Sequence, residues 1–176
     1  NPIPTVGLVA SQVVCNNSNT TAITFTGSVT GTVYSWTNSN SAINLGVQGL
    51  SNISAFTATN TSNAPITGNF TVTPSYTNAT GICTGSTSTF SITVNPTPTV
   101  NNISNQTICV GSSTNAVNFG SSFNVAGTSY SWTNSNTAIG LAASGSGNIP
   151  SFATTNSGVA PIVGLITVTP QITLGG

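Results

Sequence analysis

The sequence of 176 residues contains no Lys, Arg, Asp, Glu, His or Met. It therefore lacks the usual general acids and bases, and its Ser, Thr and Cys nucleophiles have no neighbouring base to activate them. The sequence has no His or carboxylate side chains to serve as metal ligands. It also has no cationic side chains to neutralise the phosphates of a nucleic acid. The composition predicts a protein that is not an enzyme, needs no cofactor or metal and binds no nucleic acid.

Long apolar runs are also missing. No stretch of about 18 apolar residues occurs, so we expect no membrane span. The chain begins without Met, basic segment or apolar signal core, which predicts a mature or partial chain. What it has instead is Asn (23), Thr (32) and Ser (25), with 37% hydrophobic residues and a mean hydropathy of +0.23. Disordered chains combine low hydrophobicity with high charge, and because this chain has neither, we predict that it folds.

The sequence contains the same unit twice. Four stretches of the first half recur in the second, the first two at an offset of 94 residues and the last two at 96. They are 1–6 with 95–100, QVVC at 12–15 with QTIC at 106–109, 34–45 with 130–141 (10 of 12 positions identical), and 52–74 with 148–170 (13 of 23). A period near 95 is too long for a solenoid coil. We predict two tandem domains, residues 1–94 and 95–176.

Within each copy, apolar residues alternate with Thr or Ser, which is the period of a half-buried strand. Seven strands are predicted in a full copy, near 5–14, 21–27, 32–37, 42–46, 52–59, 66–74 and 87–94. Gly, Asn and Ser gather between these runs, as they do in turns. The pattern favours an all-β fold of tandem antiparallel sandwiches of immunoglobulin type, with no convincing helix.

The second copy ends at Gly176, before the counterpart of the strand at 87–94. We therefore expect the second sandwich to lack its last strand and to expose an unpaired edge. The strand has two candidate sources. Either the chain continues and supplies the strand itself, or a neighbouring subunit donates one, as in donor-strand complementation. Residues 7–10 (GLVA), which are more apolar than their counterparts 101–104 (NNIS), suggest the N-terminal segment as that donor.

The three cysteines follow the repeat. Cys15 precedes the second predicted strand and Cys83 the last, positions that can meet at one end of a sandwich. We predict a Cys15–Cys83 disulfide formed in an oxidising compartment. Cys109 is the counterpart of Cys15, and its own partner is expected at 177–179, which leaves Cys109 unpaired in this chain. A reactive thiol would need a nearby cation to lower its pKa, and the sequence has none.

Trp36 and Trp132 share the frame YSWTNSN. A core Trp on this strand is typical of immunoglobulin-like sandwiches, so we predict that both are core residues. The alternative is that they form a platform on which sugars stack, but no other aromatic residues cluster near them in the sequence. Asn-x-Ser/Thr motifs, which are acceptors for glycans, are about as frequent as the composition alone gives.

Several of these stretches carry a family resemblance. NPTPTV at 95–100, YSWTNSNTAIGL at 130–141 and CTGSTSTFSITVNPTPTV at 83–100 resemble the PKD-like, immunoglobulin-fold repeats of very large secreted surface proteins and adhesins of Bacteroidota. The resemblance covers essentially the whole chain and implies tandem spacer domains exported to the cell surface. Better-known PKD domains carry an Asp-containing W-x-F-G-D-G turn after the Trp. Here Thr37-Asn38-Ser39-Asn40 follows Trp36, so no functional residue carries over.

The function expected from the sequence is a non-catalytic structural repeat unit of an extracellular fibre or adhesin stalk. Its expected partners are neighbouring repeats or identical subunits, because a net charge near zero promotes association. The alternative is a cell-surface recognition module that binds glycan or another cell through loops at the sandwich ends.

Overall fold

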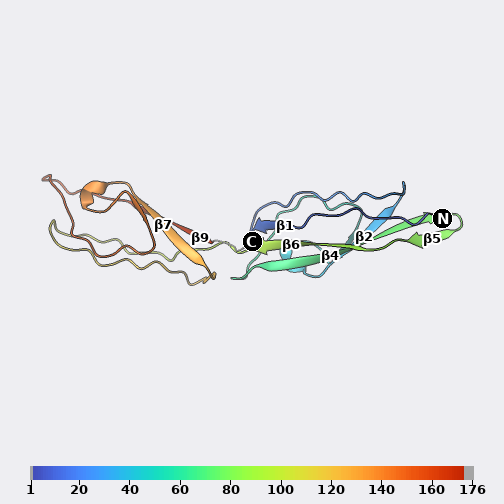
Figure 1. The fold of residues 1–176 in the computed structure, drawn as a ribbon. Coiled ribbons are helices and arrows are strands. Elements are labelled where there is room, and N and C mark those ends of the chain that lie inside the picture. The colour runs from blue at the N-terminus through green and yellow to red at the C-terminus, as the bar shows by residue number, and fades with distance from the viewer. Residues whose placement is uncertain (1, 173–176) are drawn as a thin grey trace. The chain divides into compact units, whose positions relative to one another are not determined.

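The computed structural model describes residues 2–172. The chain divides into two compact units, Asn1–Thr97 (unit 1) and Pro98–Gly176 (unit 2). The described residues form β-strands and two single-turn 3-10 helices, which confirms the all-β fold (Figure 1). The strands of unit 1 are β1 (Gln12–Cys15), β2 (Val33–Asn38), β3 (Gln48–Leu50), β4 (Ile66–Asn78), β5 (Gly81–Thr84) and β6 (Ser88–Asn95). Those of unit 2 are β7 (Thr128–Asn134), β8 (Ser144–Ser146) and β9 (Ile166–Ile172).

Unit 1 contains one six-stranded sheet in the order β1-β6-β4-β2-β3, with β5 paired to the second half of β4. β1 runs parallel to β6, and the other pairs are antiparallel. Figure 1 shows β4 and β6 running side by side along the unit. Phe90, Ile92 and Val94 of β6 alternate along its buried face. The strand therefore has the period of two that the sequence predicted for it.

A second layer covers the inner face of this sheet. Its two extended segments, 19–25 and 52–58, are joined by isolated bridges rather than by a continuous ladder. Side chains replace part of the ladder, since the Phe25 N–H donates to Asn52 Oδ1 (2.9 Å) and the Phe56 N–H to Thr20 Oγ1 (3.1 Å). The strands predicted at 21–27 and 52–59 are therefore extended layers of the core without being regular strands. Phe25 lies 6.5 Å from Phe90 of the facing sheet, measured between ring centroids.

The strand predicted at 42–46 is wrong. Residues Ser41–Ile43 form a 3-10 turn (η1), in which Asn40 Oδ1 caps the first turn by accepting from the Ala42 N–H (3.0 Å). The turn ends at Asn44, which has a φ of 71°. Asn tolerates this left-handed conformation better than most residues. The same turn, η2 (Thr137–Ile139), recurs in unit 2 with Gly140 at its end. The short strands β3 and β5 were not predicted.

Unit 2 repeats part of this arrangement. Its sheet has three strands in the order β8-β7-β9, and bridges at Ser113–Ala153 and Val117–Ile149 join its second layer. Among the residues described in unit 2, no strand corresponds to β1, β5 or β6. Residues 106–109 are the counterpart of β1 and belong to no ladder. The reason is that β1 pairs only with β6 in unit 1, and the corresponding partner is missing among the described residues.

Candidate functional site

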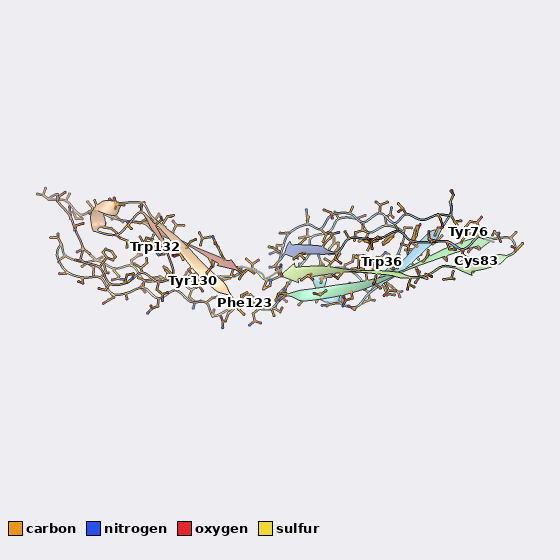
Figure 2. The ribbon with its side chains drawn as sticks, viewed as in Figure 1. Trp36, Tyr76, Cys83, Phe123, Tyr130 and Trp132 are labelled. Carbon is orange, nitrogen blue, oxygen red and sulfur yellow. The ribbon has the colours of Figure 1, made fainter. Side chains whose placement is uncertain are left out.

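The structure places the sequence-predicted residues in different parts of the two units. Cys15 lies opposite Asn95 at one end of the six-stranded sheet, and Cys83 lies opposite Tyr76 in the β4–β5 pair. Figure 2 shows Cys83 and Tyr76 together at one end of unit 1. Because Asn95 adjoins the start of β4 at Ile66 and Tyr76 lies ten residues further along that strand, the two thiols are separated by about 33 Å at the usual rise per strand residue.

All three cysteines are free thiols. A disulfide needs Cα atoms within about 7 Å of each other, so the predicted Cys15–Cys83 bond is wrong. The prediction failed because it placed both residues at the same end of a sandwich, whereas β1 and β5 pair with opposite ends of the sheet. Cys109 is exposed, and the partner expected for it at 177–179 lies outside the described residues. Within residues 2–172, no group of three or more His, Cys, Asp and Glu residues is suited to hold a metal ion.

Trp36 and Trp132 lie inside their respective units, with 7% and 6% of their surface exposed (Figure 2). Each ring packs on a glycine of the neighbouring strand. A Cβ built on Gly49 would lie 2.2 Å from Trp36 Cζ2, and one built on Gly145 would lie 2.3 Å from Trp132 Cζ2. Rings covered in this way have no free face for stacking on a sugar. Their Nε1 atoms are buried without a hydrogen-bond partner in both units.

The buried asparagines form polar contacts that sequence reasoning missed. Asn38 is 4% exposed, and its amide donates to Asn40 O (3.0 Å) and Leu45 O (3.1 Å) while its Oδ1 accepts from the Asn40 N–H. Asn134 makes the same contacts in unit 2. One feature of the sequence could have indicated these contacts: both asparagines of the YSWTNSN frame are present in each copy. They shape the turn after the Trp-bearing strand.

The core is much more open in unit 2 than in unit 1. Val72 of β4 is fully buried, whereas its counterpart Val168 of β9 is half-buried. Ile43 is likewise fully buried and its identical counterpart Ile139 half-buried. The buried cluster of unit 1 contains all three apolar residues of β6, and nothing in the described part of unit 2 supplies an equivalent.

We call the side of β9 that does not pair with β7 the open edge. The strand slot is the place beside residues 162–168 that is equivalent to that of β6 beside Ile66–Val72 in unit 1, and of these residues only 166–168 belong to β9. β9 is an end strand of its sheet, so the backbone groups along its open edge have no strand partner among the described residues. An unpaired edge of this kind is a template for another strand. The open edge and the strand slot are therefore the candidate interaction site of the chain.

Unit 2 also has a shallow hollow in its surface. Residues 102–106 and 115–118 line a shallow hollow of about 390 Å³ whose side chains are all uncharged. The amide of Gln106 spans it, donating to Asn115 O (3.1 Å) and accepting from the Asn115 N–H (2.8 Å). Gln12 makes the same pair of bonds to Thr21 in unit 1. The hollow is therefore bordered by a structural contact common to both units.

No known protein family and no curated protein matches the chain. No helix among the described residues is long and apolar enough to cross a membrane.

Proposed function

We propose that the chain is a non-catalytic structural repeat unit of an extracellular fibre or adhesin stalk. The observation that carries this proposal is the repetition of one β unit, with its internal contacts retained, within a single chain. The caps of η1 and η2, the glycine under each Trp and the Gln12 and Gln106 bonds recur in both copies. The contacts found in both copies are those that hold a unit together, as expected of a spacer domain.

The finer description of the fold belongs to the same proposal. Unit 1 carries a sheet whose first and last strands pair in parallel, faced by a second layer. This arrangement supports an immunoglobulin-like sandwich of the PKD-like type found in secreted surface proteins of Bacteroidota. Such repeats act as spacers, and the expected location is the cell surface.

The surface chemistry supports association with neighbouring repeats or identical subunits. The chain has no charged side chain, so like-charge repulsion does not oppose contact between copies. Contacts made by such a surface are also insensitive to ionic strength, because there are no charges for salt to screen. The open edge of β9 provides a place at which a neighbour can pair.

Immunogold electron microscopy of the source cells tests the proposal, together with the mass of the native material under denaturing and reducing conditions. We expect label on extended surface structures. A mass far above 17.5 kDa would identify a covalent array of repeats, and a mass near 17.5 kDa separate subunits; both agree with a structural role. Label confined to the cell interior would refute it. Binding on a glycan array that is lost when the sandwich-end loops are altered would favour the recognition module.

A further inference from the structure

The chain contains eight Asn-x-Ser/Thr motifs, and the structure places them in very different surroundings. A transferase can attach a glycan to a folded chain only where the Asn side chain and its neighbours project from the surface, so a usable motif is expected in a surface loop. The burial and hydrogen bonds of each Asn therefore separate usable acceptors from structural residues. The eight are Asn16, Asn19, Asn52, Asn60, Asn69, Asn78, Asn102 and Asn105.

Four of these asparagines are held by contacts that build unit 1. Asn60 is 2% exposed, and its Nδ2 donates to Ala64 O and to Val94 O of β6, both at 2.8 Å. Its counterpart Asn156, which is in no such motif, keeps the equivalent bond to Ala160 O at 2.9 Å. The other three accept hydrogen bonds at Oδ1: Asn16 from the Asn60 N–H (2.8 Å), Asn19 from the Thr57 hydroxyl (2.8 Å) and Asn52 from the Phe25 N–H (2.9 Å). A glycan at any of the four would displace these contacts.

Asn69 is exposed but lies in the middle of the sheet of unit 1. On one side, residues Ile66–Val72 of β4 pair with β6, and on the other, Phe70–Ser75 pair with β2. The Asn69 N–H also donates to Ser39 Oγ at 2.9 Å. The motif therefore cannot enter the active site of a transferase without breaking the sheet on both sides.

Asn102 and Asn105 of unit 2 are exposed and belong to no strand. Gln106, the middle residue of the second of these motifs, is held by two hydrogen bonds between its amide and the backbone of Asn115. Among residues 2–172, no hydrogen bond joins either Asn to the hydroxyl of its own motif. Exposure alone thus leaves the amide and the hydroxyl of these two motifs apart.

The remaining motif forms the tip of the β4–β5 hairpin. Asn78 is the last residue of β4, and the other two residues of the motif form the turn into β5. Residues 77–82 are all exposed. Figure 2 shows Tyr76 and Cys83, which are paired just below the tip, at one end of unit 1. Exposed tips of this kind accept added groups with little cost to the fold.

The hydroxyl of this motif is already bonded to the acceptor amide. Thr80 Oγ1 donates to Asn78 Oδ1 at 2.8 Å, and the Thr80 N–H donates to the same oxygen at 2.9 Å. An amide nitrogen is a poor nucleophile because its lone pair is delocalised onto the carbonyl. Hydrogen bonds donated to Oδ1 stabilise negative charge on the amide, so they make a proton of Nδ2 easier to remove.

We propose that Asn78 is an N-glycosylation site whose co-substrate is an oligosaccharide carried on a polyprenyl pyrophosphate. Asn78 Nδ2 attacks the anomeric carbon of the first sugar, and the new C–N bond forms as the bond from that carbon to the phosphate oxygen breaks. The lipid pyrophosphate leaves, and the Nδ2 proton passes to a base of the transferase, since the chain has no Asp, Glu or His. The proposal rests on the export of the chain, which is part of the proposed function.

Transfer onto the purified, folded 176-residue chain tests the acceptor wherever the protein is located in the cell. The chain is incubated with a lipid-linked oligosaccharide and a single-subunit oligosaccharyltransferase that needs no acidic residue near the motif. Chymotrypsin then cleaves after Tyr76 and Phe90, which isolates residues 77–90 with Asn78 as their only Asn. We expect the mass of the sugar on this peptide, and fragmentation should locate it on Asn78. No transfer, or transfer to another of the eight motifs in preference, would overturn the proposal.

Variants and peptides separate the effect of the fold from that of the motif. Thr80→Ala should lower the initial rate of transfer to Asn78 at least about tenfold, because it removes a hydrogen bond to the acceptor amide. Thr71→Ala removes the hydroxyl of the Asn69 motif and is the matched control, which should leave that rate unchanged. Synthetic peptides 64–76 and 73–85 should be modified at similar rates, whereas the folded chain should strongly prefer Asn78 to Asn69. Equal rates at the two asparagines in the folded chain would refute the argument from the hairpin.

The same peptide mapping of native material establishes whether the source cells use the site. We expect residues 77–90 to carry a sugar on Asn78. An unmodified peptide, or a sugar on one of its Ser or Thr hydroxyls, would overturn the proposal. Either result would leave the proposed function standing if immunogold label is found on extended surface structures, so the two proposals fail separately.

Discussion

Ile43 and Ile139 allow the effect of the unfilled slot on stability to be measured with one substitution made twice. Both residues are Ile in the same 3-10 turn, but Ile43 is 0% exposed and Ile139 is half-buried. Replacing a buried Ile by Ala removes three carbons at about 0.8 kcal/mol each and leaves a cavity, a total of about 3–4 kcal/mol. At Ile139 part of this area is already exposed to water, and we expect a loss of about 1 kcal/mol.

Calorimetry and urea unfolding of the full chain provide the assay, with hydrogen exchange of β4 and β9 assigning each transition to its unit. At 4–8 °C per kcal/mol for a domain of this size, Ile43→Ala should lower the Tm of unit 1 by about 20 °C and Ile139→Ala that of unit 2 by about 6 °C. The control is Val47→Ala, at an exposed position, for which we expect no measurable change. Equal losses at the two isoleucines would refute the argument that the missing strand opens the core of unit 2.

Three further outcomes follow from the contacts described above. Asn60→Ala should destabilise unit 1 by about 2 kcal/mol, because it leaves the buried Val94 carbonyl without its amide donor; Asn156→Ala should cost unit 2 about half as much in the same urea titrations. Gly49→Ala should destabilise unit 1 by about 1–3 kcal/mol and alter the near-UV circular dichroism of Trp36, because the new Cβ meets the indole ring; an unchanged spectrum would contradict the packing. The Tm should vary by less than about 2 °C between pH 4 and 7. The reason is that Asp, Glu and His are the side chains that titrate in that range and the chain has none. A larger shift of the Tm, measured by calorimetry, would contradict this prediction.

The strands with a clean alternation of apolar residues could be predicted from the sequence. β4 and β6 lie close to the predicted 66–74 and 87–94, because one face of each is buried and the other faces water. The second layer could be predicted as extended, but its hydrogen bonds could not. Asn52 and Thr20 supply side-chain oxygens where a ladder would need carbonyls, and no periodicity encodes that substitution.

The candidate site was predicted in part. Comparison of the two copies predicted that the given sequence ends before the counterpart of residues 87–94, and no strand equivalent to β6 is found among the described residues of unit 2. The cysteine pairing could not be predicted, since it depended on which end of the sheet each short strand joins. β1 pairs beside the last residues of β6, and β5 turns back onto the end of β4. Those pairings are set by tertiary contacts that the residues around Cys15 and Cys83 do not indicate.

The parallel pairing of β1 with β6 determines how a unit carries tension. The first and last strands of unit 1 lie side by side in the same direction, with Gln12–Cys15 in register with Ile92–Asn95. A pull on the two ends of the unit therefore drags these strands past each other, so all their hydrogen bonds are loaded at once instead of breaking in succession. Residues 106–109 have no such partner in the described part of unit 2. Under the proposed structural role, pairing of residues 106–109 in the same parallel sense would give unit 2 the resistance to a pull on its ends that β1 and β6 give unit 1.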